Sequence, residues 1–235
     1  DSCWYANPLA ERVRLNQLII SKSRMHAINT KSLAFAYRVA AFTTSTYSTN
    51  VEDGYKAGEK QLVYYYIGIK DTVRVYESAR SYAERFLMKQ TAAEIKQKDS
   101  LEFRRLLDET PGTVVEKKAD GSVATRKIVS RRPLGSKAST ELREVAMMIA
   151  NHTKDVVKLE MSLRFIDKAI EINDDGNSYS DKAIVLQKLN RIDEAIQTLE
   201  NAVVVFRSKG LKADWLIAKI EALKKGTPLK AEAEN

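Results

Sequence analysis

Cysteine is almost missing from this chain of 235 residues. Cys3 is the only one, so the chain can form no internal disulfide, no C-x-x-C redox pair and no zinc site built from cysteines. We take this cysteine, so close to the start of the sequence, as incidental. The low count does not fix the compartment, because periplasmic proteins without disulfides exist.

Proline, glycine and long apolar runs are scarce as well. The chain holds four Pro and nine Gly, and helical proteins avoid both inside their helices. No segment approaches the roughly 18–20 apolar residues that a membrane helix needs, so we expect no membrane span. Because the sequence opens on Asp1 without a Met, we expect that it has been processed or trimmed.

Motifs that carry chemistry are absent too. The sequence has no H-E-x-x-H, no G-x-S-x-G and no glycine-rich phosphate loop; Gly54 and Gly58 do not form one. The two histidines, His26 and His152, lie far apart in the chain, and His152 with Asp155 indicates a surface contact rather than a metal site. We therefore predict a protein that is not an enzyme, with no catalytic residue, no metal and no cofactor.

The net charge of +8 is concentrated in one segment. Residues 116–137 hold seven basic residues against two acidic ones, which contributes 7 − 2 = +5 of the total. A basic loop can bind phosphate backbones or acidic lipid headgroups, but we favour a solvated loop. No aromatic residue lies in this segment to stack on bases, so nucleic acid is the less favoured partner. The basic residues are Lys117, Lys118, Arg126, Lys127, Arg131, Arg132 and Lys137.

Apolar residues recur at a spacing of three or four over most of the chain, which predicts an all-α fold of antiparallel helical hairpins. The interruption is at 113–130, where β-branched runs flank Asp120-Gly121 and indicate either a small β-hairpin insertion or a loop. The predicted helices are 8–24, 30–48, 53–66, 70–97, 99–108 and several within 140–224. The predicted domains are an N-terminal helical region (1–108), a basic hairpin or flexible linker (109–139), helical repeats with a capping helix (140–225) and a frayed tail (226–235).

Three consecutive tyrosines, Tyr64 to Tyr66, lie in one predicted helix. Consecutive helical residues point in different directions, so at most two of the three can face one side. We expect one or two in the core and one at the surface.

An internal repeat organises the C-terminal half. Residues 142–174 and 175–207 are related by a shift of 33, and a helix–turn–helix period near 33–34 is typical of a stacked helical solenoid. Small residues recur where helices must approach closely, and larger apolar ones recur where hairpins would pack. The matched pairs are Ala150 with Ala183, Leu159 with Ile192, Ile166 with Leu199, Ala169 with Ala202 and, more weakly, Thr153 with Leu186 and Ser162 with Ala195.

The segment from Lys188 to Ala202 resembles the turn and second helix of a tetratricopeptide repeat. Asn190 takes the position of the small turn residue, and Ala195 and Ala202 match the small residues of that family's second helix. Three further residues matter for the comparison: Ile192 and Leu199 replace aromatics, and Tyr179 supplies the aromatic of the first helix. The usual closing proline is absent, with Arg207 in its place, and residues 213–224 would form the capping helix. The hairpin within 51–89 resembles the unit only loosely, through Ile69, Tyr76 and Ala79.

The tetratricopeptide resemblance implies a right-handed solenoid in which the first helix of each hairpin lines a groove for peptides or partner helices. The expected partner is therefore another protein or peptide. The clamp of paired Lys and Asn that grips a C-terminal carboxylate in some members is not assembled here, because Ile184 corresponds to Asn151 and Ser180 to Met147. The residues that the resemblance places in the groove are Met147, Asn151, Lys154, Ser180, Ile184, Gln187 and Lys188.

Residues 141–224 also resemble a narrower group, the helical C-terminal region of thioredoxin-family proteins from Bacteroidetes-type bacteria. The similarity lies in Glu144–Ala150, Leu163–Asn173 and Asp181–Ile196. Redox activity in that family needs a C-x-x-C pair, which this chain lacks.

We therefore expect a non-catalytic protein of interaction or scaffolding. The alternative is a helical accessory region of a thiol–disulfide oxidoreductase whose redox domain is not in this chain. That alternative would place the protein in the periplasm or cell envelope; otherwise we expect the cytoplasm. The sequence does not fix the oligomeric state.

Overall fold

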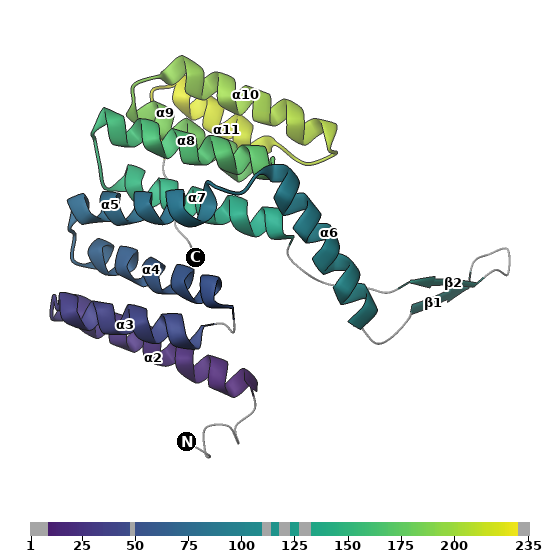
Figure 1. Ribbon diagram of the computed structural model, residues 1–235. Coiled ribbons are helices and arrows are strands. Elements are labelled where there is room, and N and C mark those ends of the chain that lie inside the picture. Colours follow the sequence, from purple (N-terminus) through teal and green to yellow (C-terminus); the bar gives the residue numbers. More distant parts are fainter. Residues whose placement is uncertain (1–8, 48–49, 110–113, 118–122, 127–132, 230–235) are drawn as a thin grey trace. The chain divides into compact units, whose positions relative to one another are not determined.

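The computed structural model describes residues 9–47, 50–109, 114–117, 123–126 and 133–229, and these residues are almost entirely helical (Figure 1). The all-α class predicted from the sequence is confirmed. The helices are α2 (Leu9–Asn29), α3 (Leu33–Thr46), α4 (Val51–Gly68), α5 (Thr72–Tyr82) with the π-helical turn η1 (Ala83–Leu87), α6 (Ala92–Glu109), α7 (Leu134–Asn151), α8 (Val156–Ile172), α9 (Gly176–Lys188), α10 (Ile192–Ser208) and α11 (Asp214–Lys224).

The helix predicted over 70–97 is wrong in its length. The chain leaves helical structure after Leu87, and α6 begins at Ala92 instead of near residue 99. A capping box explains this start: the backbone N–H of Glu94 donates to Thr91 Oγ1 (3.2 Å), and the Thr91 N–H donates back to Glu94 Oε2 (2.8 Å). The pattern Thr-x-x-Glu is visible in the sequence, and it places the helix start correctly.

Two short strands lie between α6 and α7. Strand β1 (Val114–Lys117) pairs antiparallel with β2 (Val123–Arg126), with Val114 opposite Arg126 and Lys117 opposite Val123. Half of the basic segment 116–137, including the expected turn at Asp120-Gly121, lies outside the described residues.

The chain forms two compact units, each built from two separate stretches of the sequence. Unit 1 comprises Asp1–Met88 and Glu144–Leu163, and unit 2 comprises Lys89–Arg143 and Arg164–Asn235. The borders therefore fall inside α7 and α8. The units are defined by contacts within the fold, so they do not test the domains predicted from the sequence. Those domains remain a prediction: 1–108, 109–139, 140–225 and 226–235.

Three hairpins turn in the same way. Lys31, Lys70 and Asn190 each have a left-handed backbone, with φ of 50°, 61° and 60°. After each of them, the next backbone N–H donates to the carbonyl five residues earlier: Ser32 to Ala27 (3.0 Å), Asp71 to Tyr66 (3.0 Å) and Arg191 to Leu186 (2.9 Å). This is the Schellman ending of a helix, and here it joins α2 to α3, α4 to α5 and α9 to α10.

The second helix of each hairpin buries the same positions. Residues five, nine and twelve places after the turn residue are all 9% exposed or less. They are Ala36, Ala40 and Thr43 in α3, Val75, Ala79 and Tyr82 in α5, and Ala195, Leu199 and Ala202 in α10. Hairpins in both units therefore share one register of turn and core. In the sequence alone, this register is clear only in the C-terminal half.

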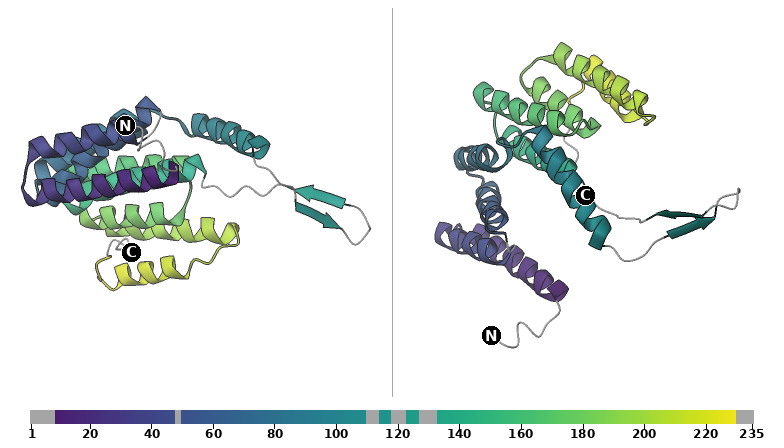
Figure 2. Two further views of the ribbon diagram at one scale, coloured as in Figure 1. Left: turned by 90° about the horizontal axis from the view of Figure 1, so that it is seen from below. Right: turned by 45° about the vertical axis from the view of Figure 1, so that its right-hand side comes forward.

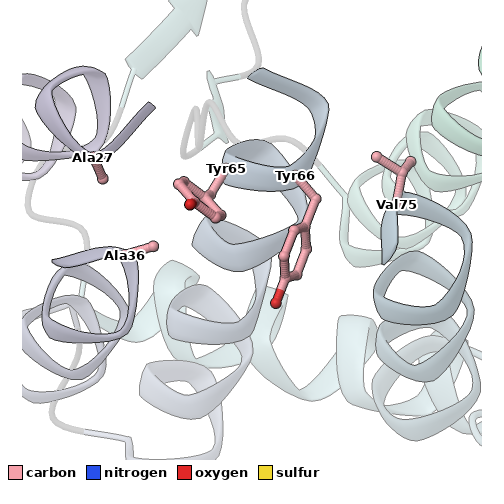
Figure 3. Close-up of a cluster of buried hydrophobic side chains, with 5 residues drawn as sticks. All are labelled: Ala27, Ala36, Tyr65, Tyr66 and Val75. Atoms are coloured by element: carbon pink, nitrogen blue, oxygen red, sulfur yellow. The ribbon is translucent and has the colours of Figure 1, made fainter. Parts of the chain in front are cut away.

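In unit 1, the core gathers around the end of α4 (Figure 3). Tyr65 and Tyr66 are buried among small residues, Ala27 of α2 and Ala36 of α3, and beside Val75 of α5. Tyr64 is only partly buried, so the prediction that at most two of the three tyrosines enter the core is confirmed. The rings of Tyr65 and Tyr66 meet edge to face, with centroids 5.4 Å apart.

Helices α3 and α4 of unit 1 approach so closely that two glycines are required between them. A Cβ on Gly58 would lie 2.8 Å from the carbonyl oxygen of Ala40 and still closer to the Thr44 hydroxyl. A Cβ on Gly54 would meet the carbonyl oxygen of Thr44 in the same way. The glycines therefore let a helix lie directly on a neighbouring backbone.

In unit 2, α9, α10 and α11 follow one another as packed neighbours (Figure 2). Phe206 of α10 meets Trp215 of α11 edge to face, with ring centroids 6.2 Å apart. Both rings press on Gly176 at the start of α9, where an added Cβ would come within 2.4 Å of the Phe206 ring. The aromatic pair thus closes one end of the three-helix group.

Of the helices in the described part of the chain, none combines the length and the apolar character that crossing a bilayer requires.

Candidate binding surface

The shared turn register defines equivalent positions on the first helix of each hairpin. We call inner-face positions those that lie ten, six, three and two residues before the turn residue. In α9 they are the predicted groove residues Ser180, Ile184, Gln187 and Lys188, and in α4 they are Lys60, Tyr64, Ile67 and Gly68.

The first two inner-face positions of α9 are covered. Ser180 and Ile184 are only 3% and 2% exposed. The ammonium group of Lys219 in α11 donates to Ser180 Oγ (2.5 Å) and lies 5.1 Å from the Trp215 ring centroid. These two predicted binding residues therefore support the packing of unit 2 and are not open to a partner.

The other two inner-face positions of α9 are at the surface. Gln187 is half-buried, and its side-chain amide contacts the backbone of the C-terminal segment at Thr227 and Leu229. Lys188 is exposed, and partial desolvation of its ammonium group lowers its pKa. A partly desolvated amide and ammonium next to solvent are groups that a polar ligand can engage.

A mostly buried ion pair joins α9 to α7. The guanidinium of Arg143 in α7 donates to Asp181 Oδ2 through Nε, at 2.8 Å, and also lies 4.0 Å from Asp175. Asp175 caps α9 by accepting from the Ser178 backbone N–H (3.0 Å). Burial raises the pKa of Asp181, while the charge and hydrogen bond of Arg143 oppose that rise. This network fixes the position of α9 and so of its inner face.

Tyr179, the aromatic expected early in the first helix, has a polar role. Its hydroxyl donates to Asp174 Oδ1 (2.7 Å), and the other carboxylate oxygen, Asp174 Oδ2, accepts from the ammonium group of Lys209 at the end of α10. Burial and the hydrogen bond to Asp174 raise the pKa of Tyr179 to about 12, so the phenol keeps its proton at neutral pH.

In unit 1, the predicted binding residues of α7 and of the turn after it differ in their exposure to solvent. Met147 is 9% exposed and belongs to the core, whereas Asn151 and Lys154 are exposed. The seven predicted residues thus form two sets, three in unit 1 and four in unit 2.

Sequence reasoning missed an aromatic and cationic cluster in unit 1. The Arg24 guanidinium lies 4.9 Å from the centroid of the Tyr64 ring, and the Lys60 ammonium lies 5.9 Å from it. Arg24 also donates to Gln61 Oε1 (3.0 Å), and Lys60 to Glu144 Oε2 (2.9 Å). Lys60 and Tyr64 occupy the inner-face positions of Ser180 and Ile184. An alignment of the two hairpins that places Lys70 opposite Asn190 would have identified Lys60 and Tyr64 as equivalent positions.

The histidines are engaged in structural contacts. His26 meets the Phe35 ring with centroids 4.9 Å apart, and His152 Nδ1 lies 2.7 Å from the Met148 carbonyl oxygen. No group of three or more metal-binding side chains exists within the residues that the structure describes. What these surfaces offer is hydrogen bonding, charge and an aromatic face, all of which suit recognition of another molecule.

No protein-family model, curated protein or solved structure gives a significant match to the chain.

Proposed function

We propose that this chain is a helical-repeat protein of the tetratricopeptide type, with a right-handed stacking of its hairpins, and that it acts by binding another protein. The binding residues, which we call the inner positions, are the accessible inner-face residues Tyr64, Gln187 and Lys188, together with the exposed residues Asn151 and Lys154 of unit 1. The activity is recognition without chemistry.

One observation carries this proposal: hairpins in both units share the same left-handed turn and the same buried positions in their second helix. A shared register presents corresponding positions of the first helix repeatedly, which is how repeat proteins build extended binding surfaces. Two positively charged, exposed residues, Lys154 and Lys188, belong to the proposed binding residues. We therefore expect a partner segment that carries acidic groups and backbone to be recognised.

The proposal is tested by photo-crosslinking in the cells that make the protein. A photoreactive amino acid is placed at one inner position at a time, Asn151, Lys154 or Lys188, and for comparison at Val73 or Val204. The comparison residues lie on second helices and are 57% and 67% exposed, so simple accessibility is controlled.

We expect one adduct of discrete mass, formed at the inner positions and absent or much weaker at Val73 and Val204. Adducts that form equally well at the two valines, or no adduct at any inner position, contradict the proposal. Purified variants are checked first by circular dichroism, so that a misfolded variant is not scored.

A further inference from the structure

Residues Thr227–Leu229, which follow α11, lie outside helical structure and contact Gln187 of α9. Helix α11 ends in a left-handed turn at Gly226 (φ 71°), where the Thr227 N–H donates to the Ala222 carbonyl (2.8 Å). Pro228 follows, and it cannot continue a helix. The chain is thereby redirected from α11 onto the inner face of α9.

The side-chain amide of Gln187 binds this segment through its backbone. Gln187 Oε1 accepts from the Leu229 N–H (2.8 Å), and Nε2 donates to the Thr227 carbonyl (3.4 Å). In an extended chain the carbonyl of one residue and the N–H of the second residue after it point to the same side. One amide group therefore satisfies both, as a neighbouring strand would.

The residue between these two contacts suits such recognition. Pro228 has no N–H to satisfy, and its fixed φ favours an extended conformation. Its side chain is exposed, whereas Leu229 is partly buried. Recognition thus depends on the backbone groups of Thr227 and Leu229, and an extended segment of another chain with proline in the middle offers the same groups.

We propose that the surface around Gln187 is a binding site for an extended peptide backbone, and that Thr227–Leu229 occupies it as an internal competitor. The inference deepens the proposed function, on which it rests for the role of the inner face of α9. An external peptide has to displace the segment, so the segment lowers the affinity of the site for such ligands.

The first measurement is hydrogen exchange at the Leu229 amide in the full chain. Gln187→Leu removes the acceptor, and we expect the exchange rate to rise about tenfold, a loss of roughly 1.4 kcal/mol of protection. Gln197→Leu is the matched control, because the Gln197 amide donates to Asn201 on its own helix, at the surface of α10. A Leu229 amide that exchanges equally fast in the wild type and in Gln187→Leu overturns the proposal.

The second measurement tests competition with a labelled peptide that has the sequence of residues 226–235. Leu229→Pro removes the N–H that Gln187 accepts without shortening the chain, and Leu229→Ala retains it. We expect Leu229→Pro to bind the peptide about tenfold more tightly than the wild type, Leu229→Ala to bind it like the wild type, and Gln187→Leu to bind it least. Equal affinities for all four proteins overturn the proposal.

These outcomes are separate from those of the crosslinking test. Protection of the Leu229 amide needs no external partner, so the internal contact can fail while crosslinks at Asn151, Lys154 or Lys188 remain. Conversely, loss of all crosslinks leaves the exchange and peptide measurements interpretable.

Discussion

The hairpins α4–α5 and α9–α10 are alike in backbone and different on their surfaces. Both turn through a left-handed residue, Lys70 or Asn190, and both bury the same three positions of the second helix. At equivalent inner-face positions, however, α4 carries Lys60 and Tyr64, which are partly exposed, where α9 carries the buried residues Ser180 and Ile184. The shared register therefore sets equivalent positions on the two helices, but it does not set whether the side chain there is buried.

The two hairpins are also held to their neighbours by different forces. Helix α4 lies on α3 through Gly54 and Gly58, so the contact is close backbone packing. Helix α9 is held by Arg143 through a mostly buried ion pair with Asp181. Close packing is weakened by a substitution that adds volume, and an ion pair is weakened by a substitution that removes one charge.

The largest effect is expected where the ion pair is broken. Arg143→Met leaves the mostly buried carboxylate of Asp181 without the guanidinium, and we expect a loss of about 3 kcal/mol of unfolding free energy at neutral pH, measured by urea denaturation. Lys182→Met is the control, because its partner Asp167 is half-exposed, and it should cost less than about 1 kcal/mol. Equal losses in the two variants would show that the Arg143 pair is no stronger than a surface contact.

This loss should depend on pH in a defined direction. Burial raises the pKa of Asp181 in the folded protein, and removal of Arg143 raises it further. A carboxyl group with a raised pKa holds its proton more tightly in the folded state than in the unfolded state. The stability that this proton provides is present at acid pH and lost as the pH rises through the folded-state pKa. The deficit of Arg143→Met should therefore shrink at about pH 4, and a deficit independent of pH contradicts this assignment.

A smaller loss is expected where the close packing is filled. Gly58→Ala places a methyl group against the Ala40 carbonyl and the Thr44 hydroxyl. We expect a net loss of about 2 kcal/mol, although alanine favours the helix. Gly135→Ala is the matched control, because the nearest atom to its added Cβ is 3.6 Å away. That variant should be neutral or up to about 1 kcal/mol more stable, and a similar loss in both would refute the packing argument.

The smallest effect is a gain at the turns. The Cβ atom of lysine makes a left-handed backbone unfavourable, whereas glycine has no Cβ. Lys70→Gly should therefore stabilise the chain by about 1 kcal/mol, measured as a shift in the thermal or urea midpoint. Asparagine adopts this conformation more readily, so Asn190→Gly should gain only a few tenths of a kcal/mol. The reverse order of these two gains would mean that the turns differ in geometry.

The all-α fold and the C-terminal repeat could be predicted because apolar spacing and small residues, such as Ala195 and Ala202, are local signals. The N-terminal hairpins were harder to find, because their buried positions hold Thr43 and Tyr82 in place of alanines, and their turns hold lysine. The residue types at these positions therefore do not show that the hairpins share a register, whereas the left-handed turn in the backbone does.

The candidate surface was predictable only in part. Spacing identifies Ser180 and Gln187 as neighbours on one helix face, but burial by Lys219 and the contact with Leu229 depend on segments about 40 residues away in sequence. The same holds for Tyr64, which becomes part of a cationic cluster only when Arg24 is folded against it. The similarity to the thioredoxin-associated helical region stays a prediction.

That one turn register organises both units is tested most directly by the backbone chemical shifts of Lys31, Lys70 and Asn190 in the isotopically labelled full chain. The structure predicts left-handed values at all three residues, each followed by one non-helical residue, Ser32, Asp71 or Arg191, before the next helix begins. Right-handed helical values at Lys70, which would make α4 and α5 one continuous helix, would contradict the shared register and the inner-face positions defined from it.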